Sequence, residues 1–170
     1  LVYYNERELE KALSFFKECL SYKEDKEITY GSYINMGMIY GELKNYKASD
    51  NYFKKAYNMS LIDNNTNAMV AILLNLGNNA QEQKQVSKAK EFYTETIKIS
   101  KKQGFHQTKI EARIGLGNVY FFLKDYKNAQ LSYGIALIGA LELGLLAKQL
   151  KIYEKLKVLA IKRKNYKDAF

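Results

Sequence analysis

The sequence predicts an all-α protein, an α-solenoid in which antiparallel helix pairs stack one after another. Three observations support this prediction. The 170 residues contain no proline, the residue that most often interrupts a helix. Gly37, Gly77 and Gly117 are 40 residues apart, and other small and aromatic residues recur at the same step. A repeat of this length indicates supersecondary units that bury a continuous core only when they stack.

Five further sets of residues follow the same step, so the repeat does not depend on the glycines alone. Each set holds one residue type or close substitutes. The sets are Tyr46, Val86, Tyr126 and Tyr166; Ser49, Ala89, Ala129 and Ala169; Phe53, Tyr93 and Tyr133; Ala56, Thr96 and Ala136; and Asn64, Gly104 and Gly144. The composition, 47% hydrophobic and 26% charged, is typical of a folded chain.

Each unit is predicted to contain a first helix, a tight polar turn and a second helix. We expect first helices at 27–43, 67–83, 107–123 and 146–163. We expect second helices at 8–23, 46–61, 86–102 and 126–143. The turns that join the two helices of a unit should lie at Lys44-Asn45, Lys84-Gln85, Lys124-Asp125 and Lys164-Asn165.

The recurring residue types explain why the helices would pack in pairs. Gly37 has no Cβ, so a neighbouring helix can approach its backbone closely. Ser49 and Phe53 are four residues apart and share one helix face, where the small residue leaves space beside the aromatic ring. The glycine-rich set that begins at Asn64 suits the residue just after a helix, where the backbone enters the left-handed region.

Two segments carry a resemblance to a known family. They are Met36-Gly37-x-x-Tyr40 and Leu116-Gly117-x-x-Tyr120, with Tyr33 and Tyr153 in a leading aromatic position. This pattern resembles the tetratricopeptide repeat, whose motif places an aromatic residue before Leu-Gly-x-x-Tyr and Ala-x-x-x-Phe. The resemblance covers essentially the whole chain, and it implies helix pairs wound into a right-handed superhelix.

Several features depart from the family pattern. The repeat here is 40 residues long, whereas the family repeat is about 34 residues long, and the closing proline is absent. Ala80 and Lys157 replace the Tyr and the Gly of the motif in their units. Longer second helices would absorb the extra residues. This longer spacing resembles the tetratricopeptide regions of bacterial signalling proteins.

The sequence begins and ends inside predicted units, which indicates a fragment of a longer protein. We expect one solenoid over 1–170, with whole units at about 30–69, 70–109 and 110–149 and partial units at 1–29 and 150–170. The second helix of the first partial unit should carry Leu9, Ala12, Phe16 and Cys19. Its first helix would include Val2 and Tyr3. Neither end resembles a polar cap, so we expect the uncapped ends to favour self-association.

Little in the sequence suits catalysis, a metal ion or a cofactor. One cysteine and one histidine exclude a disulfide framework and a multi-histidine metal site. Cys19 occupies a small-residue set and is expected to pack inside, whereas His106 lies at a loop-to-helix junction and suits a capping or surface role. The glycines form no phosphate-binding loop, and the acidic residues form no repeated pair suited to acid–base work. The sequence therefore predicts a protein that is not an enzyme and takes no cofactor.

The resemblance implies a binding surface, because the first helices of tetratricopeptide proteins line a concave groove. Residues near the motif glycine would face this groove. They are Asn35, Met38, Gly41, Glu42, Asn75, Asn78, Gln81, Glu82, Gly115, Asn118, Phe121, Phe122, Lys151, Glu154, Lys155 and Lys162.

Two patterns among these residues suggest how a partner would be held. Asn35, Asn75, Asn78 and Asn118 would form a line of amides that can pair with a peptide backbone, although Asn beside this glycine is common in the family anyway. Lys151 and Lys155, together with Asn78, partly resemble the carboxylate clamp of chaperone-binding members. Leu74 and Gly115 occupy the other clamp positions, so solvated lysines are the alternative interpretation.

The net charge of +9 lies entirely within residues 101–170, which hold 14 basic and 5 acidic residues. The densest run contains Lys148, Lys151, Lys155, Lys157, Lys162, Arg163, Lys164 and Lys167. Such a run is either a solvated helix face or a patch for nucleic acid, anionic lipid or an acidic partner. No recognised reading module accompanies it, which disfavours nucleic acid. No apolar run is long enough to span a membrane.

Three functions therefore remain in view. The first is a non-catalytic module that binds a protein or an extended peptide in its groove. The second is the sensory region of a bacterial signalling protein, with a histidine kinase or DNA-binding output segment fused beyond Phe170. The third, disfavoured by the sequence, is nucleic-acid binding through the basic C-terminal third, which would show a steep salt dependence.

Overall fold

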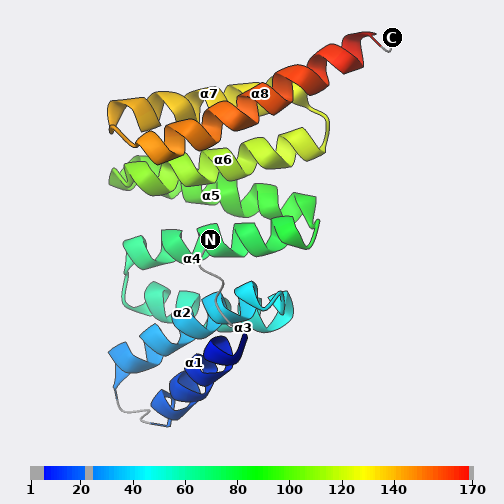
Figure 1. Cartoon of the computed structure of the whole chain (residues 1–170). Helices are drawn as coiled ribbons and strands as arrows, with labels where there is room; N and C mark the ends of the chain where they lie inside the picture. Colours follow the sequence, from blue (N-terminus) through cyan, green and yellow to red (C-terminus); the bar gives the residue numbers. More distant parts are fainter. Residues whose placement is uncertain (1–5, 22–24, 169–170) are drawn as a thin grey trace. The chain divides into compact units, whose positions relative to one another are not determined.

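The computed structural model describes residues 6–21 and 25–168, and in these ranges it contains eight α-helices and no strand (Figure 1). The helices are α1 (Glu6–Cys19), α2 (Lys26–Glu42), α3 (Tyr46–Ile62), α4 (Thr66–Glu82), α5 (Val86–Gln103), α6 (His106–Phe122), α7 (Tyr126–Glu142) and α8 (Leu146–Asp168). The predicted all-α solenoid of antiparallel helix pairs is confirmed.

The observed helices begin and end close to the predicted bounds, with exceptions at both ends of the chain. Helix α1 ends at Cys19, four residues before the predicted bound. Helix α8 runs without interruption through Lys164 and Asn165, so the turn predicted there is wrong. Two of the correctly predicted turns are closed by a second helix that packs on the first, α3 on α2 and α7 on α6. No helix follows α8 among the described residues. The predicted roles of Val2, Tyr3, Ala169 and Phe170 lie outside the described residues.

Six helices end in one shared motif that recurs every 20 residues. A left-handed residue follows each helix at Lys44, Asn64, Lys84, Gly104, Lys124 and Gly144. At the first of these, the Asn45 N–H donates to the Tyr40 carbonyl and the Lys44 N–H donates to the Gly41 carbonyl, which is the Schellman pattern. The predicted helix-end positions Asn64, Gly104 and Gly144 are therefore confirmed.

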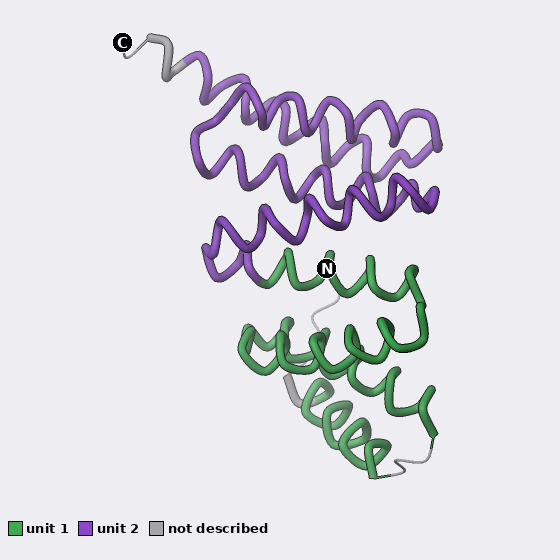
Figure 2. Tube along the Cα trace, turned by 180° about the vertical axis from the view of Figure 1, so that it is seen from behind, with its two compact units in different colours: residues 1–79 green, residues 80–170 purple. Residues whose placement is uncertain are grey.

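The chain divides into two compact units, residues 1–79 and 80–170 (Figure 2). In unit 1, α2 packs on both α1 and α3. The Gly37 backbone lies against the ring of Phe53, where an added Cβ would stand 2.7 Å from the ring carbons. The close helix approach expected at this glycine is thus present, and Met36 and Phe53 are fully buried beside it.

Unit 1 also contains a buried polar network. Asn79 of α4 donates from its amide nitrogen to Ser49 Oγ at 2.7 Å and to Asp50 Oδ1 at 2.7 Å. Ser49 Oγ in turn donates to the Gly37 carbonyl at 2.6 Å. Each polar atom buried here has a partner, so the network joins α2, α3 and α4 without leaving an unsatisfied group.

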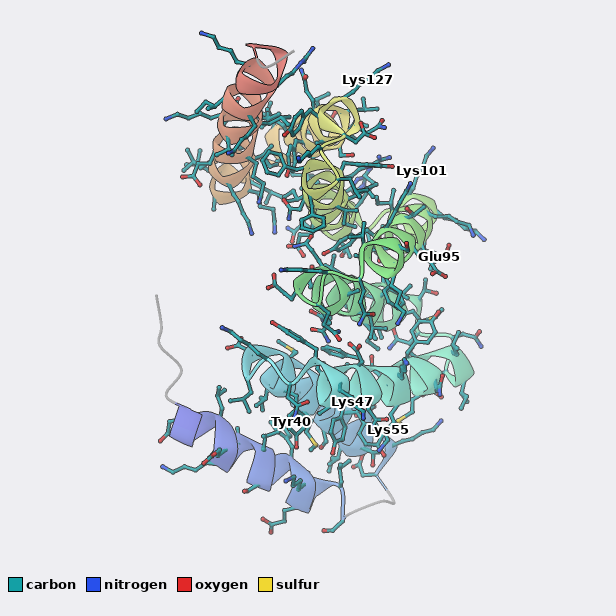
Figure 3. The ribbon with its side chains drawn as sticks, turned by 90° about the vertical axis from the view of Figure 1, so that its right-hand side faces the viewer. Tyr40, Lys47, Lys55, Glu95, Lys101 and Lys127 are labelled. Atoms are coloured by element: carbon teal, nitrogen blue, oxygen red, sulfur yellow. The ribbon has the colours of Figure 1, made fainter. Side chains whose placement is uncertain are left out.

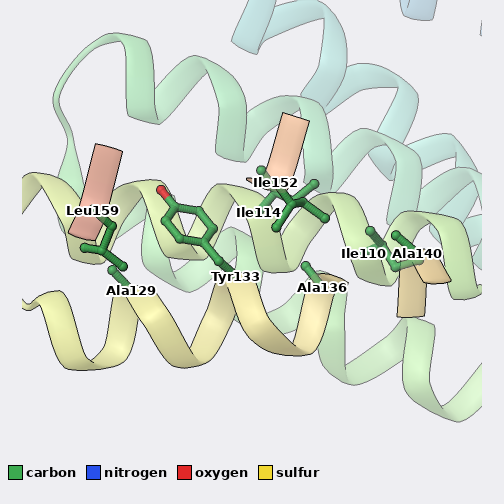
Figure 4. Packing of buried hydrophobic residues seen from close by; sticks show 8 residues of the cluster. All are labelled: Ile110, Ile114, Ala129, Tyr133, Ala136, Ala140, Ile152 and Leu159. Carbon is green, nitrogen blue, oxygen red and sulfur yellow. The ribbon is translucent and has the colours of Figure 1, made fainter. Parts of the chain in front are cut away.

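The core of unit 2 is mostly apolar, although Thr96, Ser100 and Ser132 are buried in it as well. One hydrophobic cluster gathers residues of α6, α7 and α8 (Figure 4): Ile110, Ile114, Ala129, Tyr133, Ala136, Ala140, Ile152 and Leu159. Gly117 lies against the Tyr133 ring as Gly37 does against Phe53. Gly115, expected to face the groove, is buried against the ring of Tyr93 instead.

Candidate functional site

A pocket of about 570 Å³ lies within unit 2, where the ends of several helices meet. Its volume falls in the usual range of ligand pockets, about 300–1,000 Å³. Residues of α4, α5, α6, α7 and α8 line it together with two turns. They are Gln81, Glu82, Lys84, Val86, Ala89, Asn118, Val119, Phe121, Phe122, Lys124, Tyr126 and Lys162.

The floor of this pocket is apolar because of the sequence at the end of α6. Val119 and Ala89 are buried, while Phe122 keeps 59% of its surface exposed. Phe121 packs on Tyr126 of α7, with ring centroids 5.9 Å apart. The left-handed residue Lys124 turns the chain between these two rings, so the tight turn itself brings them together.

Two amides on the pocket wall are held by tyrosines from the core. The Tyr133 hydroxyl donates to Asn118 Oδ1 at 2.9 Å, and the Tyr93 hydroxyl donates to Gln81 Oε1 at 3.3 Å. Burial raises the pKa of Tyr133 to about 12, so this hydroxyl stays a donor at neutral pH. These bonds use the amide oxygens, which leaves the NH₂ groups of Asn118 and Gln81 able to donate to a bound group.

Charged residues stand around the mouth of the pocket. Lys84, Lys124 and Lys162 are exposed and lie beside one exposed carboxylate, Glu82. The balance is cationic, and it surrounds an apolar floor. Such an arrangement suits an apolar group that carries or adjoins a negative charge.

A second pocket, of about 300 Å³, shares Asn118 and Phe121 with the first. Its other lining residues are Tyr133, Glu154, Lys155 and Val158. Lys155 is half-buried, and burial together with the nearby Lys151 lowers the pKa of its amine, whereas Glu154 acts in the opposite direction. This pocket extends the first one along α8.

The structure therefore collects part of the predicted groove set in unit 2. Six predicted residues line the first pocket and two line the second. They are Gln81, Glu82, Asn118, Phe121, Phe122 and Lys162, and Glu154 and Lys155. Lys151 is exposed one turn before Lys155. Five lining residues were not predicted because they belong to turns and second helices, whereas the family resemblance points to first helices: Lys84, Val86, Ala89, Lys124 and Tyr126. Val119 lies on α6 but was not among the predicted groove positions.

The predicted residues of unit 1 lie on α2 and α4. Asn35 and Asn75 donate from their side chains to carbonyls of their own helices, Gly31 O at 2.9 Å and Ala71 O at 3.1 Å. Met38, Glu42 and Asn78 are exposed. Asn78 belongs to unit 1 and the two clamp lysines to unit 2, so the clamp stays a prediction, as does the line of amides.

Unit 1 has an aromatic cluster on α2 and α3. Tyr40 and Tyr52 stack with ring centroids 5.5 Å apart, and Tyr33 lies 6.1 Å from Tyr52. The Lys55 ammonium lies 5.1 Å from the Tyr52 ring centroid and 5.3 Å from that of Tyr33. Figure 3 labels Tyr40 and Lys55 on this part of the chain. The cation and the rings satisfy one another within the unit.

Three further features of the described residues concern metal binding, the single cysteine and histidine, and membrane spans. Over 6–21 and 25–168, no three His, Cys, Asp or Glu side chains gather closely enough to hold a metal ion. Cys19 is half-buried, and His106 is exposed at the start of α6. Within the same ranges, no helix has the length and apolar character needed to cross a membrane.

Comparison with known proteins supports the repeat. The profile of the tetratricopeptide repeat family matches residues 30–62, which cover most of the predicted second unit. No curated protein matches the chain. The sequence match to the family is thus confined to one of the predicted repeats.

Solved structures match almost the whole chain. RapI, in its apo form, has a TM-score of 0.84 at 22% identity over 95% of this chain and 60% of its own length. BtubC from P. vanneervenii has a TM-score of 0.78 at 18% identity over 93% and 66%. Aspartyl phosphate phosphatase F from Bacillus subtilis has a TM-score of 0.65 at 18% identity over 85% and 44%. The chain spans less than two thirds of each of these proteins, and the likeness establishes a tetratricopeptide-like helical repeat fold.

Proposed function

We propose that this chain is a non-catalytic module that binds a protein or an extended peptide, and that the 570 Å³ pocket of unit 2 receives an apolar side chain of the partner. The observation that carries this proposal is the pocket itself. Phe121, Phe122 and Val119 give it an apolar floor, and the oriented amide of Asn118 stands at its wall. A mostly apolar concavity with a few placed polar groups is the usual form of a binding site.

The charges around the pocket opening indicate which kind of partner segment would bind. Lys84, Lys124 and Lys162 surround the opening with one carboxylate among them. A partner segment that places an aspartate or glutamate beside a large apolar residue would satisfy both the rim and the floor. Association would then weaken with added salt, because the rim lysines are exposed and screened.

The pocket lining also supports a role without catalysis. It offers no serine, cysteine or histidine that could act as nucleophile or general base, and Glu82 is its one carboxylate. Its other polar side chains are two amides, three lysines and the Tyr126 hydroxyl, and the amides and lysines can hold a ligand by hydrogen bonds and charge.

A displayed library of random peptides tests the proposal. The library is selected on the whole chain, and the strongest sequences are then titrated by fluorescence polarisation against Phe122→Ser and Phe15→Ser. These phenylalanines are a matched pair, because 59% and 60% of their surfaces are exposed in the two units. We expect acidic–apolar sequences whose affinity falls at least about tenfold in Phe122→Ser and is kept in Phe15→Ser. Equal affinity for both variants would contradict the pocket assignment.

The sensory role in bacterial signalling is a finer form of this proposal. The likeness in fold to a protein named aspartyl phosphate phosphatase F gives it support. The same likeness also allows a test of the non-catalytic part of the proposal. The chain is incubated with a receiver domain phosphorylated on aspartate by acetyl phosphate, and loss of the phosphoryl group is followed. We expect no acceleration of hydrolysis. Acceleration would overturn the non-catalytic proposal while leaving a signalling role in place.

Nucleic-acid binding receives less support, because part of the basic run is engaged inside unit 2. Lys148 forms an ion pair with Glu111, and Arg163 donates to Gln130 Oε1 at 2.8 Å. Lys155 is half-buried in the second pocket. The side chain of Lys167 lies outside those described. Exposed lysines that remain, such as Lys157, would give a general attraction to anions without base readout.

A further inference from the structure

The outer face of α7 carries an exposed apolar stripe. Leu131, Ile135 and Ile138 are 60%, 37% and 58% exposed. Their spacing of four and three residues places them on one side of the helix. The opposite side of α7 packs on α6 and α8 through residues such as Tyr133 and Ala136. We call Leu131, Ile135 and Ile138 the α7 stripe.

The repeat shows that the fold does not require apolar residues here. The positions 40 and 80 residues earlier lie at the same places on α5 and α3. On α5 they are Glu91, Glu95 and Lys98, and on α3 they are Asn51, Lys55 and Asn58. All six are polar, and all but the half-buried Glu95 are exposed. Figure 3 labels Glu95, Lys55 and also Lys127 at the start of α7. Contiguous exposed apolar residues at these positions indicate a contact surface.

The residues around the α7 stripe make it complementary to itself. Gly134 lies at its centre, and an added Cβ there would meet no other atom within 4 Å, so a second helix can approach closely. Consider two copies of α7 that pack antiparallel, with the two-fold axis passing between Gly134 and Ile135. Leu131 of one copy then lies opposite Ile138 of the other. The same register places Lys127 opposite Glu142 at both ends of the stripe, and both side chains are exposed.

The two end charges are poorly placed within a single helix. Lys127 lies in the first turn of α7 and Glu142 in the last, where the helix dipole disfavours each charge. Antiparallel pairing brings Lys127 to the C-terminal end of the second helix and Glu142 to its N-terminal end. Each charge then gains both an opposite charge and a favourable dipole end.

From these observations we infer that α7 is a self-association surface, and that two copies of this chain pair antiparallel and with two-fold symmetry through the α7 stripe. A two-fold contact uses one patch on both copies, as the register above requires. One pair of helices buries less than the roughly 1,200–2,000 Å² of a stable interface, so the dimer is reversible and concentration-dependent. This surface is distinct from the pocket and from the ends of the solenoid.

Sedimentation velocity of the full chain across about 1 µM to 1 mM tests the inference, a range that brackets a weak interface of this size. We expect a monomer–dimer equilibrium that Leu131→Glu weakens at least about tenfold, because a carboxylate then faces Ile138 twice in each dimer. Asn51→Glu, the same position on α3, is the matched control and should leave the equilibrium unchanged. Circular dichroism confirms folding of both variants. A monomer at every concentration, or a dimer unaffected by Leu131→Glu, would overturn the inference.

Charge exchange tests the register itself. Lys127→Glu and Glu142→Lys should each weaken the homodimer about three- to tenfold, since both ends then place like charges together. An equimolar mixture of the two variants should recover dimer, because a carboxylate then faces an ammonium group at both ends of the stripe. Recovery supports the antiparallel pairing. Failure of the mixture to exceed either variant alone would overturn it, even if Leu131→Glu abolishes the dimer.

Discussion

The two units use the same three repeat positions in opposite ways. In unit 1 these positions hold Asn79, Ser49 and Asp50, which form the buried hydrogen-bond network between α3 and α4. In unit 2 they hold Val119, Ala89 and Lys90. Val119 and Ala89 are buried and line the pocket, while the Lys90 ammonium lies 5.3 Å from the centroid of the Tyr120 ring.

The difference shows how one repeat can be specialised without a change of fold. A satisfied polar network fixes the spacing of its helices and fills the space between them. The apolar version supplies no such fixed partners and instead presents a wall to the pocket. The proposed binding role of unit 2 therefore depends on two features. One is the absence of the polar network at these three positions, and the other is the pair Phe121 and Phe122.

The largest loss of stability should follow when Val119 of unit 2 is replaced by asparagine, the residue that unit 1 has at this position, without its hydrogen-bond partners. Val119→Asn buries an amide without partners and removes apolar burial, so we expect a loss of about 3 kcal/mol in the free energy of unfolding. Urea unfolding followed by circular dichroism measures it. Adding Ala89→Ser and Lys90→Asp supplies the partners and should recover more than half of the loss. A single variant within about 0.5 kcal/mol of the wild type would contradict the comparison.

The reverse change should break the network of unit 1. Asn79→Ala removes the donor to Ser49 and Asp50, and we expect a loss of about 2 kcal/mol in the free energy of unfolding. Asn58→Ala, on the exposed side of α3, is the matched control and should cost no more than about 0.5 kcal/mol. If the two variants unfold at the same urea concentration, the network does not hold α3 and α4 together.

A smaller effect is expected for the hydroxyl that orients Asn118. Tyr133→Phe removes one hydrogen bond, so we expect a loss of about 1 kcal/mol at neutral pH. The pKa of Tyr133 is raised from 10.0 to about 12 in the folded state, which therefore holds this proton more tightly than the unfolded state does. Stability should be level below pH 10 and fall as the pH rises from 10 to 12.

Thermal unfolding at about pH 8, 9, 10 and 11 measures this dependence. The fall above pH 10 should be shallower in Tyr133→Phe, because one of the tyrosines that resists ionisation is gone. Tyr93 remains as a second such group, since burial and the nearby Glu82 also raise its pKa. An identical alkaline slope in the variant and the wild type would show that Tyr133 titrates as an exposed tyrosine does.

The smallest change in stability is expected at the pocket mouth. Phe122 is largely exposed, so Phe122→Ser should alter the free energy of unfolding by no more than about 0.5 kcal/mol, as should Phe15→Ser. Any loss of peptide affinity in Phe122→Ser can then be assigned to binding. A loss of stability above about 1 kcal/mol would remove this distinction and show that Phe122 is part of the core.

The helices could be predicted from the sequence because the repeating residues are the ones that pack between helices. Gly37, whose backbone lies against the Phe53 ring, is an example. The sequence did not predict that Lys44, Lys84 and Lys124 are left-handed, since this conformation costs a lysine about 1–2 kcal/mol and is imposed by closure of the helix pair. The Asn79 network was also missed. Its partners are about 30 residues away, and the sequence shows no spacing that joins them.

The candidate site was predicted in part for a related reason. Family resemblance pointed to first helices, and that was enough to select Gln81, Asn118, Phe121 and Phe122. The pocket, however, lies where helix ends meet, so much of its wall comes from turns and second helices. Val119, which stands where unit 1 has Asn79, is one of the residues that line the pocket. Single positions of this kind carry no periodic signal.

Chemical-shift mapping of a library-selected peptide on the ¹⁵N-labelled chain tests the central claim most directly. The claim predicts perturbations at the end of α6 and the start of α7, centred on Val119, Phe121, Phe122 and Tyr126, with α2 and α3 unchanged. Perturbations confined to α2 and α3, or spread evenly over the chain, would contradict the assignment of binding to the pocket of unit 2.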